Sequence, residues 1–332
     1  MFKKYNSIEN TYRTEFLDKI KSHGFWGDQF VVQEKAHGAN LSYWTTNGVD
    51  FHSSKRTGAI ELGEKFYNHD LVLQKIQSKL EQIWLDLKEE INNLEQVTIF
   101  GEFIGGSYPH PDVLKDKNGL KAQQGIFYSP SNQFYAFDIL INGHKYLDVE
   151  VANSFFQKQD LLHAKTLFSG SIIDCLGYSN EFNSTIPSEL NLPEIIPNIA
   201  EGVIIKPNIN RHFNNKGRVI LKNKNEKWSE NIKFNKTIKK EDEISDQIIK
   251  LREAILTYVT ENRLNNVLSK IGTVSEKDAG KILGIYSKDV VEDFMKDFHH
   301  ITDELEKKEL KLITKSFSKR AFELVENFLN AI

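Results

Sequence analysis

Two hydrophobic patterns alternate over roughly the first 235 residues. Apolar residues three and four positions apart predict amphipathic helices over residues 14–24, where Gly24 ends the helix, and over residues 70–94. Short runs in which apolar and polar residues alternate predict half-buried strands. Asn47-Gly48 is typical of a two-residue hairpin turn after one such run. The predicted strands cover residues 29–35, 40–46, 49–54, 96–106, 133–141, 201–207 and 218–224.

The pattern changes from Ile244 to the end of the chain. This segment has no proline and few strand formers, and helical periodicity covers residues 246–272, 275–298 and 307–329. The charged stretch "FNKTIKKEDE" precedes it, whereas the Pro/Gly/Lys-rich stretch 107–125 is predicted to be a loop. We therefore predict an α+β fold class, with one domain over residues 1–237 and a small all-α domain over residues 238–332.

Composition narrows the class of protein. Hydrophobic residues make up 39% and charged residues 27% of the chain, as in ordinary globular domains. No stretch approaches the roughly 20 apolar residues that cross a bilayer, and the N-terminal segment lacks the apolar core of a secretory signal. The single cysteine, Cys175, excludes a disulfide framework and a cysteine-based zinc site. We expect no membrane partner and a cytoplasmic location, in the host cytoplasm if the source is a virus.

Charge is unevenly distributed along the chain. The net charge of −3 argues against a protein that binds nucleic acid by bulk basicity. Residues 218–240, however, carry eight Lys/Arg against two Glu, whereas the chain from Glu241 onward carries 14 basic and 18 acidic residues. The stretch 218–240 is therefore a candidate cationic strip for a polyanion.

Lys35 ends the apolar run "VVQEK" and is followed by His37 and Gly38. A half-buried ammonium must be paired or must lose its proton. One interpretation is a structural lysine paired with Glu34 or with a distant carboxylate. The other is a nucleophile, which requires a neutral amine and hence a pKa lowered by burial or by neighbouring cations.

Strand alternation places Arg218, Ile220, Lys222 and Lys224 on one face of the last predicted strand. These lysines either protect a solvated edge strand or bind phosphate beside Lys35. Arg56 follows a predicted strand, where it either lies in a solvated turn or offers a planar fork to phosphate or ribose oxygens.

Two carboxylates and one aromatic residue lie within apolar strands. Glu102 shares a face with Phe100, and Glu201 is expected to share a face with Val203 and Ile205, opposite Lys206. Each acid must meet a cation, a metal or a hydroxyl, so a buried ion pair is the alternative to a functional role. Phe137 is either a core residue or a ring that stacks on a nucleobase.

The order of these segments is more specific than any one of them. "EKAHGAN", "SKRTG", "FGEF", "FYAFDI", "EGVIIKP" and "ILKNKN" follow one another as in the covalent nucleotidyltransferases, which include DNA ligases, RNA ligases and capping enzymes. The chain most resembles the RNA ligase 2 family, including the kinetoplastid RNA-editing ligases, over nearly its whole length. This resemblance implies a nucleotidyltransferase domain with antiparallel sheets flanked by helices, followed by a helical domain.

The resemblance implies an ATP-dependent RNA ligase that joins 3′-hydroxyl and 5′-phosphate ends, preferentially at nicks in a duplex. Lys35 would attack the α-phosphate of ATP and carry AMP as a lysyl phosphoramidate, which passes to the RNA 5′ end. Glu34 and the backbone of Ala36 would hold the adenine, and Phe137 would stack on it. His37 would take part in forming the adenylate.

The remaining roles concern the sugar, the phosphates and a metal. The resemblance implies that Arg56 and Glu102 hold the ribose, that Asn40 and Arg56 lie near the phosphate, and that Lys222 and Lys224 contact the α-phosphate. Glu201 would hold a divalent metal, Mg²⁺ or alternatively Mn²⁺, directly or through water. Lys206 would lie nearby.

The helical domain would bind the RNA duplex, for which "RLNNVLSKIG" offers Arg263, Asn265, Asn266 and Lys270. A-form RNA is read mainly by shape and 2′-hydroxyls, so sequence preference should be weak. We expect a monomer. An ATP-dependent DNA ligase, a capping guanylyltransferase and a catalytically idle RNA-binding protein remain alternatives. His37 stands where DNA ligases and capping enzymes usually have aspartate, which argues against the first two.

Overall fold

The structure is a computed structural model that describes residues 1–214, 217–230 and 244–331. It divides into two compact units, Met1–Lys227 and Trp228–Ile332. The domain boundary expected at residues 237/238 lies outside the described residues, as do residues 231–240 of the basic strip. None of the described helices is long and apolar enough to cross a membrane.

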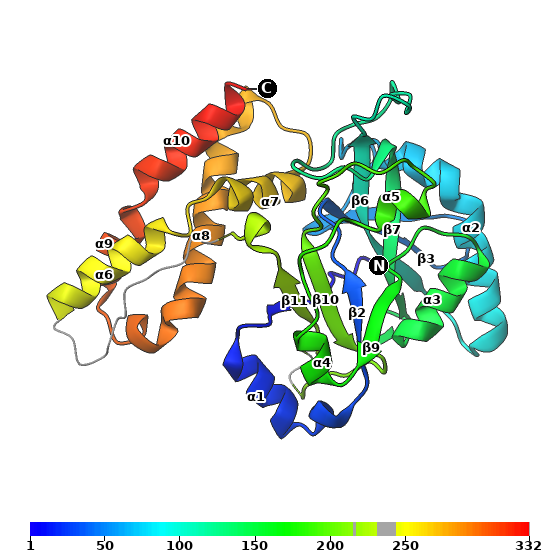
Figure 1. Cartoon of the computed structure of the whole chain (residues 1–332), viewed down its shortest axis with the longest axis horizontal. Helices are drawn as coiled ribbons and strands as arrows, with labels where there is room; N and C mark the ends of the chain where they lie inside the picture. Colours follow the sequence, from blue (N-terminus) through cyan, green and yellow to red (C-terminus); the bar gives the residue numbers. More distant parts are fainter. Residues whose placement is uncertain (215–216, 231–243, 332) are drawn as a thin grey trace. The chain divides into compact units, whose positions relative to one another are not determined.

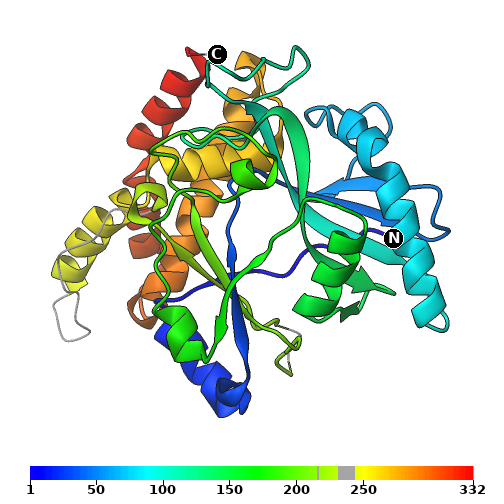
Figure 2. The same cartoon turned by 45° about the vertical axis from the view of Figure 1, so that its right-hand side comes forward.

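Two sheets form the framework of the first unit (Figures 1 and 2). One sheet has the order β1-β11-β10-β2-β9, and its pairs are antiparallel except β1 with β11. Its strands are β1 (Glu9–Asn10), β2 (Phe30–Glu34), β9 (Thr166–Gly170), β10 (Gly202–Pro207) and β11 (Leu221–Lys224).

The other sheet is antiparallel throughout and has the order β5-β4-β3-β6-β7-β8. Its strands are β3 (Ala39–Thr45), β4 (His52–Lys55), β5 (Gly58–Ala59), β6 (Val97–Ser107), β7 (Ser129–Ile141) and β8 (Lys145–Tyr146). The predicted hairpin connects β3 to β4, but its connection covers residues 46–51 rather than the two residues Asn47-Gly48, and the second strand begins only at His52. The predicted loop 107–125 contains no helix or strand after β6 ends at Ser107.

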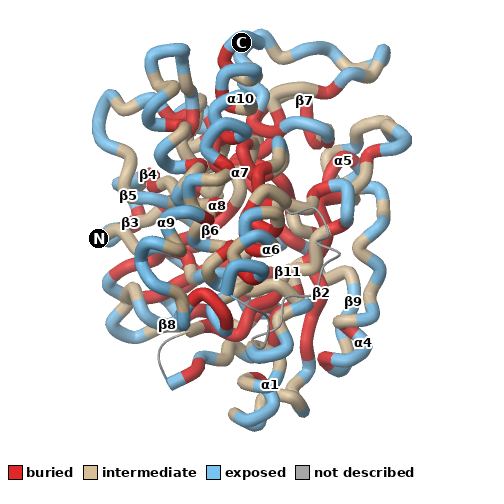
Figure 3. Tube along the Cα trace, turned by 90° about the vertical axis from the view of Figure 1, so that its left-hand side faces the viewer, coloured by how far each residue is buried: buried red, intermediate tan, exposed pale blue. Residues whose placement is uncertain are grey.

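Helices cover the outer face of each sheet, and the two sheets share an inner cluster. The helices α2 (His69–Glu90) and α3 (Val149–Lys158) pack on the second sheet. The helices α1 (Thr14–Ser22) and α4 (Ile172–Leu176) pack on the first sheet, and α5 (Ile186–Glu189) lies in the following segment. A smaller apolar cluster joins residues of β6, β7 and β10 between the sheets, and β2 is buried along its whole length (Figure 3).

The second unit consists of helices. The predicted block 246–272 is two helices, α6 (Ile244–Leu256) and α7 (Glu261–Ile271), because Thr260 is extended and its hydroxyl caps α7 at Arg263 N. The block 275–298 corresponds to α8 (Ala279–Thr302), and the last block is again two helices, α9 (Lys307–Lys315) and α10 (Ser318–Leu329). The predicted α+β class with antiparallel sheets, followed by an all-α region, is thus confirmed. Short 3-10 turns lie at Phe25–Gly27, Glu226–Trp228 and Glu276–Asp278.

Candidate active site

Strand register brings Lys35, Glu201 and Lys224 to one end of the first sheet. Lys35 directly follows β2, and its N–H donates to Gly202 O at 2.9 Å, so it continues the pairing of β2 with β10. Lys224 ends β11 opposite Gly202. Three segments that lie far apart in the sequence therefore place their side chains around one point.

Gly202 corrects the expected orientation of Glu201. Simple alternation would put Glu201 on the same face of β10 as Val203 and Ile205. These two residues do pack in the apolar cluster between the first sheet and its helices. Gly202 has a φ of 142°, and a Cβ there would lie 2.1 Å from Asn223 O. This glycine breaks the alternation, and Glu201 turns toward Lys35 and Lys224.

Glu201 is the centre of an ion cluster. Its Oε2 accepts from Lys35 Nζ at 2.6 Å, and its Oε1 lies 2.9 Å from Lys224 Nζ. His37 Nδ1 lies 3.5 Å from Oε2. Burial opposes ionisation of Glu201, but Lys224 and Lys35 outweigh it and hold the pKa of this carboxyl well below its usual range. Lys222, two residues earlier on the same face of β11, is half-buried.

The turn after Lys35 fits closely against the second sheet because Gly38 lacks a side chain. A Cβ at Gly38 would lie 2.3 Å from Phe103 O. The N–H of His37 donates to the hydroxyl of buried Tyr128 at 2.9 Å. Ala36, between Lys35 and His37, is buried. The segment that carries the proposed nucleophile is thus held by contacts to β6 and by Tyr128.

Glu102 and Asn40 face the site from the second sheet, where they are paired across β3 and β6. Burial raises the pKa of Glu102 to about 7, although Lys35 and Arg56 partly offset this effect. Arg56, just after β4, donates from Nη1 to Tyr5 O at 2.7 Å. The site therefore contains a carboxyl whose pKa lies above the usual range of glutamate.

Glu34 is buried and forms the other side of the site. Its Oε2 accepts from the N–H and the hydroxyl of Thr185, each at 2.8 Å. Its Oε1 is buried without a hydrogen bond among the described residues. Burial raises the pKa of this carboxyl, despite hydrogen bonds from Ser184 and Thr185. Such an acceptor fits the exocyclic amine of adenine. Thr185 was not predicted, because its segment carries no clear motif.

Phe137 lies at a bulge in β7. Phe100 pairs with Asp138 and Gly101 pairs with Ala136, so Phe137 is the extra residue. Its ring is partly buried and packs edge-on against Tyr5, with ring centroids 5.0 Å apart. A bulge re-aims a side chain, and this one presents Phe137 in the cluster between the sheets.

A buried ion network lies beside Phe137 and was not predicted. Asp138 accepts from Arg218 at 2.8 and 2.9 Å, from Lys206 at 3.1 Å, and from the Tyr5 hydroxyl. Lys206 also donates to Phe137 O at 3.1 Å. Burial opposes ionisation of Asp138, but Arg218 and Lys206 outweigh it and lower its pKa. Lys206 therefore supports the bulge, and Arg218 is not part of a cationic surface strip as the sequence suggested.

The structure also revises the predicted RNA contacts in the helical unit. The Arg263 side chain is 0% exposed and lies 2.7 Å from Asp289 and 2.9 Å from Asp293. Because the Arg263 side chain is buried and paired with two carboxylates, it cannot contact RNA in this arrangement. Lys270 is half-exposed and pairs with Asp289 at 2.9 Å, whereas Asn265 and Asn266 are partly exposed. Glu230, Asp289 and Asp293 are the one group of three acidic ligands close enough for a metal among the described residues.

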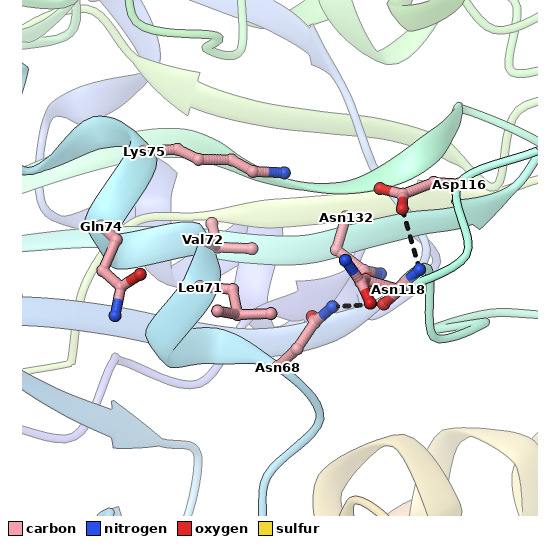
Figure 4. Close-up of a pocket in the computed structure, with 8 residues that line it drawn as sticks. All are labelled: Asn68, Leu71, Val72, Gln74, Lys75, Asp116, Asn118 and Asn132. Atoms are coloured by element: carbon pink, nitrogen blue, oxygen red, sulfur yellow. Dashed lines mark hydrogen bonds between the residues drawn. The ribbon is translucent and has the colours of Figure 1, made fainter.

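A separate cavity of about 270 Å³ lies between the start of α2 and the loop 107–125 (Figure 4). Asn68 Nδ2 donates to Asn118 O at 2.8 Å, which fastens the loop to the helix. None of the predicted site residues lines this cavity. Its lining residues are Asn68, Leu71, Val72, Gln74, Lys75, Asp116, Asn118 and Asn132.

Comparison with solved structures gives matches to the RNA ligase of Naegleria gruberi. An apo mutant of that enzyme matches with a TM-score of 0.43 and 17% identity, over 69% of this chain and 57% of that one. A mutant with ATP and Mn matches with a TM-score of 0.44 and 14% identity, over 68% and 57%. This chain thus spans less than two thirds of the length of those proteins.

Sequence comparison gives family matches over both units. The "RNA ligase" family model matches residues 28–224, more than half of the chain, and "T4 RNA ligase 2 C-terminal" matches residues 241–323. Mitochondrial RNA-editing ligase 2 of Trypanosoma brucei brucei is 28% identical, over 90% of this chain and 84% of that protein. Mitochondrial RNA-editing ligase 1 of the same organism is 27% identical, over 85% and 73%. The chain therefore belongs to the RNA ligase family, of the RNA ligase 2 type, and the resemblance recognised in the sequence is confirmed at that level.

Proposed function

We propose that this RNA ligase seals nicks in duplex RNA and that Lys35 carries AMP between ATP and the RNA 5′ end. The convergence of Lys35, Lys224 and His37 on the buried carboxylate of Glu201 supports this role most directly. Such a cluster holds a primary amine in a fixed position beside a second cation, as displacement at a phosphate requires.

Three displacements follow from this assignment. First, Lys35 Nζ bonds to the α-phosphorus of ATP, the bond to pyrophosphate breaks, and the amine loses a proton. Second, an oxygen of the RNA 5′-phosphate attacks the same phosphorus, the P–N bond breaks, and the leaving nitrogen takes up a proton to become an amine again. Third, the 3′-hydroxyl attacks the activated 5′-phosphate, its proton is lost, and AMP leaves. Each step is a nucleophilic displacement at a phosphorus atom, so catalysis depends mainly on positioning and on neutralising charge.

The chain's own residues have defined tasks in this mechanism. Glu201 aims the Lys35 amine, and Lys222 and Lys224 neutralise α-phosphate charge from β11. Glu34 Oε1 accepts from the adenine amine, the Ala36 backbone borders the base, and the Phe137 ring stacks on it. The ribose hydroxyls would meet Arg56 and Glu102. Asn40 would lie near the phosphate, and His37 would steady Glu201 during adenylate formation.

Glu201 is also the residue that would hold a divalent metal. Mg²⁺ commonly takes one or two carboxylates and completes its shell with water and substrate phosphates, and Mn²⁺ accepts the same oxygen ligands. The donor type fits, although both Glu201 oxygens contact ammonium groups in this structure. Bound there, the metal would offset phosphate charge and compete with Lys35 for the carboxylate.

The test is transfer of label from [α-³²P]ATP to the full chain. We expect labelling of the wild type, no labelling of Lys35→Ala, and normal labelling of Lys55→Ala. Lys55 is a matched control because it lies near Arg56 but pairs with Glu64. EDTA should abolish the label, and Mg²⁺ or Mn²⁺ should restore it. Wild-type labelling of Lys35→Ala would overturn the assignment.

Nick preference needs a second measurement on the same protein. Equal amounts of nicked RNA duplex, nicked RNA–DNA hybrid, nicked DNA and single-stranded RNA should be offered together with ATP. We expect the nicked RNA duplex to be sealed fastest. Faster sealing of single-stranded RNA or of nicked DNA would refute the substrate proposal and leave the role of Lys35 intact.

A further inference from the structure

The helix α9 has one face made of lysine. Lys307, Lys308, Lys311 and Lys315 are all exposed, and at about 100° per residue they fall within an arc of roughly 100°. From the first to the last of them the helix advances about 12 Å. We call these four residues the α9 lysine face. No comparable row of cations was recognised from the sequence.

The α9 lysine face has no acidic partner among the described residues. In the parts of the chain that the structure describes, none of these four ammonium groups has a carboxylate oxygen within 4.0 Å. Two other lysines of the same unit are paired, Lys270 with Asp289 and Lys288 with Glu292. The one acid within α9, Glu309, accepts from Glu306 N at 2.8 Å in a capping box.

The opposite side of α9 is already used for folding. Ile313 is fully buried in the core of the helical unit, and α9 packs on α6 (Figure 1). Basic helices that lie in a bilayer surface need a free apolar face beside the charges. Here only Leu312 is an exposed large apolar residue on α9, with 54% of its surface exposed. The arrangement therefore favours a hydrated polyanion over a lipid surface.

We infer that the α9 lysine face binds the phosphate backbone of duplex RNA. This inference rests on the proposed function, because RNA ligation supplies the polyanion. A row of about 12 Å is long enough to contact more than one phosphate of a single strand. Contacts to phosphates position a duplex without reading its sequence. The face would thus take the task that buried Arg263 cannot perform.

The test changes all four lysines to glutamine, which has a similar helix propensity and no charge. The matched control changes Lys88, Lys145, Lys277 and Lys281 to glutamine, which are exposed and scattered over the chain. Both variants lose the same charge. Binding of a nicked RNA duplex to the full chain should be measured without ATP at several salt concentrations, and self-labelling with [α-³²P]ATP should be measured in parallel.

We expect the α9 variant to bind the duplex on the order of tenfold more weakly near 0.1 M salt, while the control stays within about twofold. The slope of log affinity against log salt should become shallower by about 0.9 for each lost phosphate contact. Self-labelling should stay at the wild-type level in both variants.

Two results would overturn the inference. One is an unchanged affinity and salt slope in the α9 variant. The other is a loss of binding to phosphatidylserine vesicles, with duplex binding unaffected, which would assign the face to membranes. Absence of self-labelling in the wild type would instead refute the proposed role of Lys35, so the two failures are distinguishable.

Discussion

Replacing Asp138 by asparagine should strongly destabilise the first unit. Asp138 is 0% exposed and is the shared counter-ion of Arg218 and Lys206, which are 2% exposed each. Asparagine has nearly the same shape and still accepts one hydrogen bond, but it removes the negative charge. Two buried cations would then remain without an anion between them.

The magnitude follows from the distances. At an effective dielectric constant of about 20, unit charges about 3 Å apart attract by roughly 5 kcal/mol. Desolvation opposes this attraction, and breaking one partner of a buried ion pair typically lowers the free energy of unfolding by about 3–5 kcal/mol. We expect Asp138→Asn to fall in that range. Burial lowers the pKa of Lys206 to about 8 even with Asp138 present, so the variant's Lys206 should lose its proton more easily. The destabilisation should therefore be smaller at pH 9 than at pH 6.

Urea unfolding followed by tryptophan fluorescence can measure this change. Trp26, Trp44 and Trp84 lie in the first unit, so the signal reports mainly on that unit. The matched control is Asp160→Asn, whose fully exposed carboxylate lies 3.4 Å from Lys79 and whose loss should leave the urea midpoint close to that of the wild type. An Asp138→Asn protein within about 1 kcal/mol of the wild type at pH 6 would refute the reasoning.

Two further predictions concern the proposed nucleotide site. Burial raises the pKa of Glu102 to about 7, so between pH 5 and 7 the folded state binds a proton that the unfolded state has released, and stability falls as pH rises. Glu102→Gln should flatten the dependence of the urea midpoint on pH in that window, and a parallel pH profile would count against the assignment. Phe137→Ala should raise the KM for ATP on the order of tenfold, while Phe137→Trp should keep it near the wild-type value, because an aromatic face suffices for stacking. Equal KM values for Phe137→Ala and wild type, from initial labelling rates, would exclude a stacking role.

Hydrophobic patterning was sufficient to predict the main strands and the long helix of the first unit. It was weaker where tertiary contacts decide local structure. The strand expected over 218–224 is β11 only from Leu221, because Arg218 is drawn into the network around Asp138. The weakly patterned region from residue 149 onward contains α3, β9 and Thr185, none of which was predicted.

Individual site residues were recognisable from motif order, but their arrangement was not. Lys35 and Glu201 meet only because β2 pairs with β10, which no local pattern encodes. The orientation of Glu201 depends on the positive φ at Gly202, and strict alternation predicted the wrong face. Arg263 looked like an exposed helix residue. Arg263 can be buried because Asp289 and Asp293, one turn apart on α8, both form ion pairs with its guanidinium group.

The contacts of Tyr5 make the start of the chain part of the proposed nucleotide pocket. Its carbonyl anchors Arg56, its hydroxyl reaches Asp138, and its ring borders Phe137. Proteolytic removal of this tyrosine, or a fusion partner that displaces the N-terminal segment, would remove the contacts to Arg56, Asp138 and Phe137 together. Affinity tags are therefore better attached at the C-terminus. A preparation that has lost its N-terminal residues through Tyr5 is expected to be inactive.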